Sequence, residues 1–141
     1  MNNTNISDPK VHLIVLNWND KEISKKCLSS IEKVSYSNYK VLIVDNNSQD
    51  GSVEFFKKYF PQYDILALDK NLKYAGGNNA AVDYLKPEEE DFLVFINNDT
   101  IVSSDFLNHL VAPFSNDANS IITVPKILFA IDINKIWYAG G

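Results

Sequence analysis

The chain has 141 residues, a net charge of −5, one cysteine and thirteen basic residues, every one of which is lysine. An acidic balance without arginine disfavours a nucleic-acid-binding surface, and a single cysteine excludes a disulfide framework and a zinc ribbon. No segment reaches the ~18 consecutive apolar residues of a membrane-spanning helix, and the polar start has no apolar signal segment, which together favour one cytoplasmic domain.

Short apolar runs alternate with amphipathic stretches along residues 10–141, the expected domain, after residues 1–9, which we expect to form a disordered leader. The length and β-branched content of the apolar runs predict six strands, over Val11–Leu16, Lys40–Val44, Asp64–Leu68, Phe92–Ile96, Ser120–Val124 and Lys126–Ala130. The acidic run Glu88–Asp91 is interpreted as a solvated loop, because charge runs usually are.

Apolar residues at helical spacing, together with capping signals, predict helices between these strands. The first is capped by Asp20 and carries Cys27 on its apolar face, where we expect the thiol to fill the core. The others are predicted over Ser52–Tyr59, Asn78–Leu85 opened by Gly76–Gly77, and Asp105–Val111, which Pro113 limits. The alternation implies a mostly parallel α/β sheet flanked by helices, which binds ligands beyond the carboxyl ends of its strands.

Polar residues concentrate at those strand ends. Asp45 can accept hydrogen bonds from a ribose or a pyrimidine base, or it can cap the turn that follows it. The pair Gly76–Gly77 lets backbone approach a ligand or forms a tight turn, but no G-x-G-x-x-G follows the first strand, which disfavours a dinucleotide fold. The residues at the strand ends are Asn17, Trp18, Asn19, Asp45, Asp69, Lys70, Asn71, Gly76, Gly77, Asn78, Asn97, Asn98 and Asp99.

The segment Asn97–Asp99 carries the sharpest of these signals, because an apolar strand stops there at two amides and a carboxylate. Mg²⁺ and Mn²⁺ prefer such oxygen ligands and share them with substrate phosphates, whereas the alternative is a simple turn. His12 and His109 have no partners at metal-ligand spacing and are interpreted as structural. Trp18 either stacks on a base or packs under its loop, and we favour packing.

Four ordered segments resemble the nucleotide-binding half of family 2 glycosyltransferases: Val11–Asn19 (VHLIVLNWN), Val41–Ser52 (VLIVDNNSQDGS), Asn71–Ala80 (NLKYAGGNNA) and Phe92–Thr100 (FLVFINNDT). The closing segment Ile136–Gly141 (IWYAGG) is similar to their rhamnosyltransferase-like branch. The resemblance implies a GT-A, Rossmann-like fold, truncated before its acceptor-binding half. It also implies inverting, metal-assisted transfer from a nucleoside diphosphate sugar to a saccharide or lipid-linked acceptor, with this chain carrying the donor-binding part.

Carried over position by position, the resemblance implies a donor nucleotide site and one metal ligand. Asp99 is implied as the ligand of Mg²⁺ or Mn²⁺, and Asn97 departs from the aspartate that family members usually carry there. The implied donor is a UDP- or dTDP-sugar, bound in the cytoplasm or at the cytoplasmic face of the membrane. The implied nucleotide-binding residues are Asn17, Asn19, Asp45, Asn71, Gly77, Asn78, Asn97 and Asn98.

The catalytic base of the family is a carboxylate in an acidic motif that we do not find in this sequence, so donor binding is expected of these residues and complete catalysis is not. A module that binds nucleotide sugars without transferring them therefore stays open. A nucleotidyltransferase also stays open, although a basic, glycine-rich loop would be expected in place of Asn17–Asp20. A phospho-receiver domain with Asp45 as acceptor ranks last, because no acidic cluster follows the first strand.

Overall fold

The computed structural model describes residues 8–117 and 119–139, which fall into two compact units. The first unit runs to Leu28 and continues over Ser37–Thr100, and the second comprises Ser29–Tyr36 and the residues from Ile101 onward. Residues 1–7 of the expected leader lie outside the described residues. Asp8 is attached to the first unit, because its carboxylate and carbonyl accept hydrogen bonds from Ser37 Oγ (3.1 Å) and Asn38 Nδ2 (2.7 Å).

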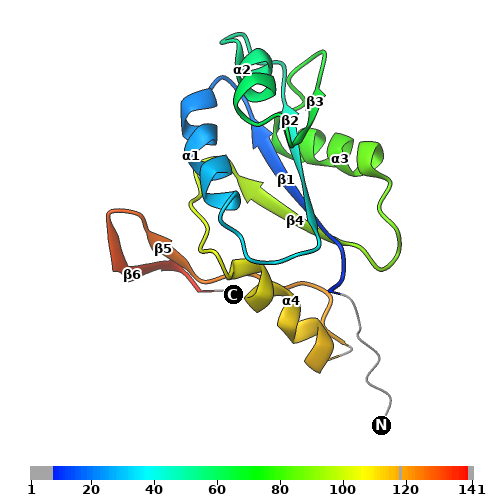
Figure 1. Cartoon of the computed structure of the whole chain (residues 1–141), viewed down its shortest axis with the longest axis vertical. Coiled ribbons are helices and arrows are strands. Elements are labelled where there is room, and N and C mark those ends of the chain that lie inside the picture. The colour runs from blue at the N-terminus through cyan, green and yellow to red at the C-terminus, as the bar shows by residue number, and fades with distance from the viewer. Residues whose placement is uncertain (1–7, 118, 140–141) are drawn as a thin grey trace. The chain divides into compact units, whose positions relative to one another are not determined.

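A parallel sheet of four strands in the order β3-β2-β1-β4 forms the centre of the first unit (Figure 1). The register pairs Asn17 with Asp45 and Leu16 with Asn97, so the carboxyl ends of three strands are level. The chain adds β2 and β3 on one side of β1 and β4 on the other, which makes the end of β1 the point where such sheets bind ligands. The strands are β1 (Val11–Asn17), β2 (Tyr39–Asp45), β3 (Asp64–Ala67) and β4 (Phe92–Asn97), as predicted within one residue at each end.

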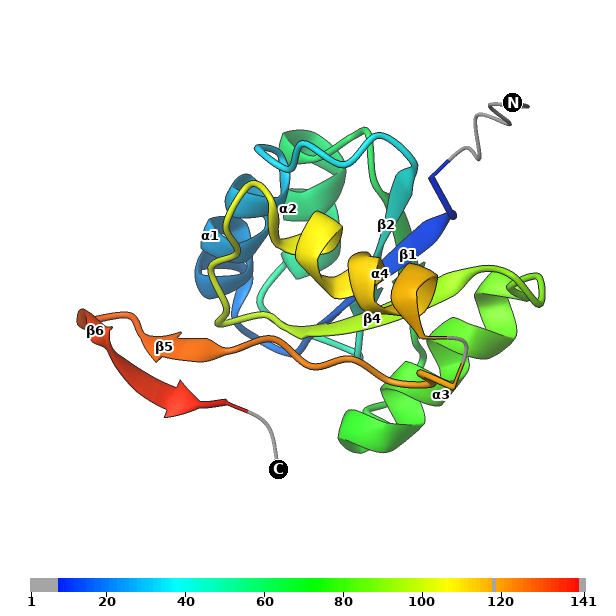
Figure 2. The same ribbon diagram turned by 90° about the horizontal axis from the view of Figure 1, so that it is seen from below.

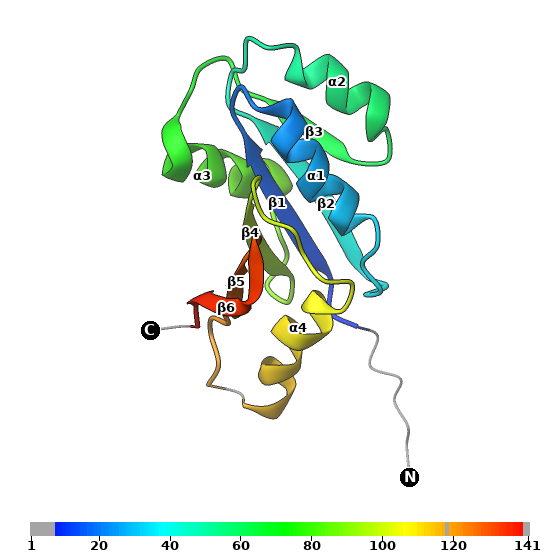
Figure 3. The same ribbon diagram turned by 90° about the vertical axis from the view of Figure 1, so that its left-hand side faces the viewer.

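Helices cover both faces of this sheet. Figures 2 and 3 show α1 (Lys21–Ile31) and α2 (Ser52–Tyr59) on one side and α3 (Lys73–Leu85) on the other. Ile14 and Ala81 belong to the buried cluster between the sheet and α3, and alternate residues of each strand face the opposite side. Cys27 is fully buried, which confirms its expected place in the core.

Helix α3 begins at Lys73, five residues before the predicted start, so the expectation that Gly76–Gly77 open it is wrong. Both glycines lie inside the helix, where their N–H groups belong to the helical hydrogen-bond pattern. A Cβ atom at position 77 would lie 2.6 Å from Leu16 Cδ1, so the missing side chain allows α3 to pack closely on β1. Packing, rather than a turn, explains this glycine.

The acidic run before β4 is only partly a solvated loop. Glu88–Glu90 are exposed as expected, whereas the Asp91 side chain is only 8% exposed. Its Oδ2 accepts hydrogen bonds from Lys10 Nζ (3.2 Å) and the Glu88 N–H (3.1 Å), and lies 2.9 Å from His12 Nε2. The run therefore ends on a structural carboxylate at the amino end of the sheet.

The second unit contains α4 (Phe106–Asn116) and an antiparallel pair, β5 (Ile127–Phe129) and β6 (Asp132–Tyr138). The prediction that Pro113 limits the helix is wrong, because α4 continues through it to Asn116. Both Pro113 and His109 are exposed, so the His109 carbonyl that the proline leaves without a helical partner can be hydrated.

The predicted strand Ser120–Val124 is also wrong, since residues 119–126 adopt no strand. Thr123 Oγ1 instead donates to the Leu110 carbonyl (2.9 Å), and Pro125 removes a donor that a sheet would need. The predicted strand Lys126–Ala130 is reduced to β5, and its partner β6 was not anticipated.

None of the helices in the described part of the chain is long and apolar enough to cross a membrane.

Candidate functional site

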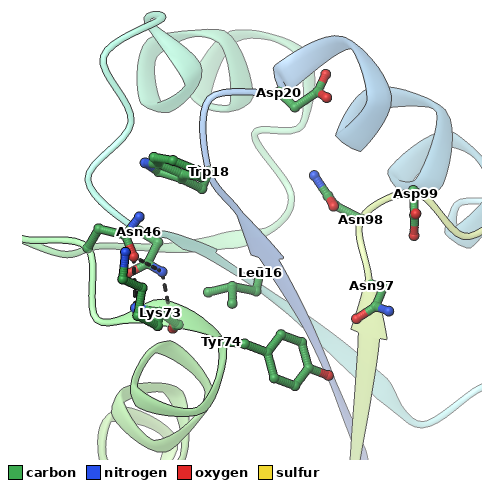
Figure 4. Close-up of a pocket in the computed structure, with 10 residues that line it drawn as sticks. Leu16, Trp18, Asp20, Asn46, Lys73, Tyr74, Asn97, Asn98 and Asp99 are labelled. Atoms are coloured by element: carbon green, nitrogen blue, oxygen red, sulfur yellow. Dashed lines mark hydrogen bonds between the residues drawn. The ribbon is translucent and has the colours of Figure 1, made fainter.

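A cleft of about 410 Å³ lies in the first unit at the carboxyl ends of the strands (Figure 4). Segments that follow all four strands contribute to it, which is the convergence that the sequence predicts for a parallel sheet. The lining residues are Leu16, Trp18, Asp20, Asn46, Asn71, Lys73, Tyr74, Asn97, Asn98 and Asp99.

Four of the predicted site residues line this cleft, namely Asn71, Asn97, Asn98 and Asp99. Asn97 and Asp99 are exposed, so both side chains are accessible to a ligand. The other predicted residues do not line it: Asn17, Asn19, Asp45, Gly77 and Asn78.

Asn17 connects the strand ends beneath the cleft and is fully buried. Its Nδ2 donates to Asp45 Oδ1 (2.9 Å) and Ser48 Oγ (3.1 Å), and its Oδ1 accepts from Ser24 Oγ (2.7 Å). Ser24 Oγ in turn accepts a hydrogen bond from Asn98 Nδ2 (2.9 Å). A continuous series of hydrogen bonds therefore runs from the end of β4, through α1 and β1, to the end of β2.

Asp45 is 2% exposed and uses both carboxylate oxygens inside the protein. Oδ1 accepts from Asn17, and Oδ2 accepts the Ser48 N–H (2.9 Å), so the turn-capping alternative describes its contacts. Asn19 has a similar local role with a left-handed backbone (φ 54°), since its N–H donates to Ser48 Oγ (2.9 Å) and its Oδ1 accepts the Gln49 N–H (2.6 Å).

Gly77 and Asn78 are both buried within α3, on the side of the sheet that the helix covers. Gly77 contacts the strand through the close approach to Leu16 described above. Both residues therefore belong to the packed side of α3, and neither lines the cleft.

Asn46 was not predicted as a site residue, yet its amide organises one wall of the cleft. Its Nδ2 donates to Asn71 Oδ1 (3.0 Å) and the Lys73 carbonyl (3.2 Å), and its Oδ1 accepts the Leu72 N–H (2.8 Å). Asn46 itself is 2% exposed. The segment between β3 and α3 is thereby fixed to the end of β2, a contact that no sequence spacing indicates.

Three further lining residues were missed or misjudged from the sequence. Trp18 is 55% exposed, so the favoured interpretation that it packs under its loop is wrong. Asp20 caps α1 as predicted, its Oδ1 accepting the Ile23 N–H (3.4 Å), but it also lines the cleft. Tyr74 is 57% exposed and also lines the cleft. The only feature of the sequence that could have indicated this is its position shortly after the polar segment that follows the third strand.

The carboxylates of the cleft are Asp20, just before α1, and Asp99, just after β4 (Figure 4). No group of three or more His, Cys, Asp or Glu side chains suited to a metal occurs in the described residues. One exposed carboxylate beside two amides nevertheless fits Mg²⁺ or Mn²⁺, which commonly use one or two protein carboxylates and complete their shell with water and substrate phosphate.

Burial and the nearby Asp99 charge raise the pKa of the Cys27 thiol to about 12.

Neither histidine is among the residues that line the cleft, as their structural interpretation predicts. His12 is 4% exposed and hydrogen-bonds to Asp91. His109 lies 3.2 Å from Asp105 on the first turn of α4.

The sequence model of a family described as Glycosyl transferase family 2 matches residues 12–140 of the chain. This chain belongs to glycosyl transferase family 2. The resemblance noted from the four motifs is thereby confirmed, and the nucleotidyltransferase and phospho-receiver alternatives lose their support.

Curated relatives of this family-2 chain are considerably longer than it is. Glycosyltransferase AglE of Haloferax volcanii is 28% identical over 81% of this chain, which spans 38% of AglE. Beta-monoglucosyldiacylglycerol synthase of Trichormus variabilis is 26% identical over 85% of the chain, which spans 26% of that enzyme.

Solved structures of similar fold are GT-A enzymes, which confirms the fold expected from the resemblance. Staphylococcus aureus TarS in complex with UDP matches with a TM-score of 0.65 and 22% identity, over 76% of this chain and 32% of that one. The mannosyltransferase PcManGT of Pyrobaculum calidifontis, in complex with GDP-Man and Mn²⁺, matches with a TM-score of 0.64 and 21% identity, over 76% and 32%.

Proposed function

We propose that this chain binds a nucleoside diphosphate sugar in the cleft, as the donor-binding part of an inverting glycosyltransferase that acts on a saccharide or lipid-linked acceptor. One observation carries the proposal: polar residues after all four parallel strands line a single cleft at the switch point of the sheet. The ligands named for TarS and PcManGT, which are UDP, UDP-GlcNAc and GDP-Man, support this donor class. We also propose the cytoplasm as the compartment, which the single cysteine favours.

In this proposal the exposed ring of Trp18 stacks on the base, and the amides of Asn71, Asn97 and Asn98 hydrogen-bond to the nucleotide. The carboxylate of Asp45 already accepts hydrogen bonds from Asn17 and from the Ser48 N–H. In this proposal it contacts the base or the ribose through the lone pairs that remain on its two oxygens. The remaining predicted residues do not line the cleft, and in this proposal they hold the strand ends, the loop after β1 and α3 in place: Asn17, Asn19, Gly77 and Asn78.

We assign Asp99 as the protein ligand of a divalent cation, Mg²⁺ or Mn²⁺. Such an ion supplies charge stabilisation to the diphosphate leaving group. Asp99 suits this role because it is exposed and lines the cleft, and the Mn²⁺ in the PcManGT complex supports the choice of metal. No residue of the cleft is assigned as the base that deprotonates the acceptor.

Titration of the chain with UDP and dTDP, each with Mn²⁺, with Mg²⁺ and with chelator, tests the proposal. We expect binding that weakens strongly in chelator. Asp99→Asn should lose most of this metal dependence while remaining folded, because an amide still makes the turn but lacks the charge. Asn97→Ala should have a smaller effect.

Asp83→Asn is the matched control, since Asp83 is an exposed carboxylate of α3 that does not line the cleft. Equal nucleotide affinity in metal and in chelator would overturn the metal assignment. Absence of nucleotide binding under every condition would overturn the proposed function itself.

A further inference from the structure

Lys73 is the single basic residue among the ten that line the cleft. Asp20 and Asp99 are the acidic ones, and Figure 4 shows Lys73 and Asp99 on opposite sides of the cleft. The whole chain contains no arginine. The ammonium of Lys73 is therefore the positive side chain that the lining of the cleft presents to a ligand.

The backbone of Lys73 adopts a left-handed conformation with φ 62°. That region is unfavourable for residues with a side chain, and glycine avoids the penalty. Three hydrogen bonds hold the segment in place: Asn46 to the Lys73 carbonyl (3.2 Å), the Lys73 N–H to Asn71 Oδ1 (2.7 Å), and Asn46 to Asn71 (3.0 Å). The protein thus carries a strained lysine where glycine would be more stable.

The charge of Lys73 is not used within the described residues. The ion pairs found there join Lys10, His12, His109 and Lys135 to aspartates, and none involves Lys73. A cation without a carboxylate partner, on the wall opposite the acidic one, suits an anionic group bound between the two walls.

Resting on the function proposed above, we infer that the Lys73 ammonium binds the phosphate groups of the nucleotide donor from the wall opposite Asp99. In this inference the unfavourable backbone conformation of Lys73 is retained because a glycine at this position would not supply a positive charge to the cleft. A charge-assisted hydrogen bond of this kind contributes more to binding than a neutral one.

The experiment separates charge from strain with two substitutions. Lys73→Met removes the charge and keeps the left-handed residue, whereas Lys73→Gly removes both. We expect each to weaken UDP binding by about ten- to a hundredfold and to leave the affinity for uridine, which has no phosphate, within about twofold. Lys73→Gly should also raise the melting temperature, and Lys73→Arg should retain most of the UDP affinity.

Two control variants separate backbone strain from charge. Lys86 is left-handed as well (φ 46°), at the other end of α3 and outside the cleft, so Lys86→Gly should raise the melting temperature without changing UDP affinity. Lys70→Met removes an exposed charge three residues before Lys73 and should change neither quantity.

Unchanged UDP affinity in both Lys73→Met and Lys73→Gly would overturn the inference and leave the proposed function intact. Parallel losses for uridine and UDP would also overturn it, because they would place Lys73 at the nucleoside. Failure of the wild-type chain to bind UDP would overturn the proposed function together with the inference.

Discussion

Asn17 and Asp45, the last residues of β1 and β2, are partners in the register of the sheet and are joined by a 2.9 Å hydrogen bond between their side chains. Both side chains are almost completely buried. The bond places a carboxylate in the interior, where it needs every available donor. The ends of the two central strands are therefore joined beneath the cleft by a buried side-chain hydrogen bond, in addition to the backbone pairing of the sheet.

Asn17→Ala should lower the free energy of unfolding by about 1–3 kcal/mol, because it removes donors to Asp45 and Ser48 and an acceptor for Ser24. Urea unfolding followed by circular dichroism measures the change. Asn79→Ala is the control, since Asn79 is exposed on α3. A stability loss no larger than that of the control would show that the buried hydrogen bonds contribute little.

The two glycines of α3 should respond differently to alanine. A Cβ at position 76 would lie 2.8 Å from Leu72 Cβ, an atom fixed close to the backbone, so Gly76→Ala should destabilise the fold by about 1–3 kcal/mol. At position 77 the Cβ would meet the flexible end of Leu16, which lines the cleft and can rotate. Gly77→Ala should therefore change stability by less than about 1 kcal/mol and weaken UDP binding more than Gly76→Ala does. Thermal melts and UDP titrations of the two variants, side by side, test this order, and the reverse order would contradict it.

Asp91 should make the fold sensitive to acid. Hydrogen bonding from His12, and to a smaller extent from the Glu88 N–H and Lys10, lowers the pKa of this carboxyl from its ordinary value of 3.8. The folded state then binds the proton more weakly than the unfolded state, so this stabilisation is present above pH 3.8 and is lost as the pH falls through the lower native pKa. Asp91→Asn should reduce stability at neutral pH and flatten its dependence on pH in this acidic range. Urea midpoints measured across the range for wild type, Asp91→Asn and the exposed control Glu89→Gln decide the point; a wild-type slope retained by Asp91→Asn would refute the assignment.

Cys27 should resist alkylation as long as the chain is folded. Its side chain is fully buried, and burial together with the Asp99 charge raises the pKa of the thiol to about 12, so little reactive thiolate is present at neutral pH. Iodoacetamide should modify it at the rate of global or local unfolding and rapidly in urea. Asn79→Cys in a Cys27→Ala background supplies an exposed thiol for comparison. Equal rates for the two thiols in native buffer would contradict the expected protection.

The sequence was sufficient to predict the parts of this protein that depend on local pattern. The apolar runs that became β1 to β4 and the helix Ser52–Tyr59 agree closely with the structure, because hydrophobic periodicity and capping are encoded locally. The convergence of Asn71 and Asn97–Asp99 followed from the parallel topology. The role of Asn46 and the early start of α3 could not be predicted, since both depend on hydrogen bonds between segments about 25 residues apart in the chain. The outward position of Trp18 likewise depends on which neighbours a loop acquires after folding.

The exposed ring of Trp18 in the cleft gives this chain an optical signal of its own. The sequence contains two tryptophans, and the other, Trp137, is 63% exposed on β6. A Trp137→Phe variant would leave Trp18 as the sole indole emitter, placed among the residues proposed to receive the base. Quenching of its fluorescence on stacking would report nucleotide binding directly, without a label and without turnover of a donor sugar.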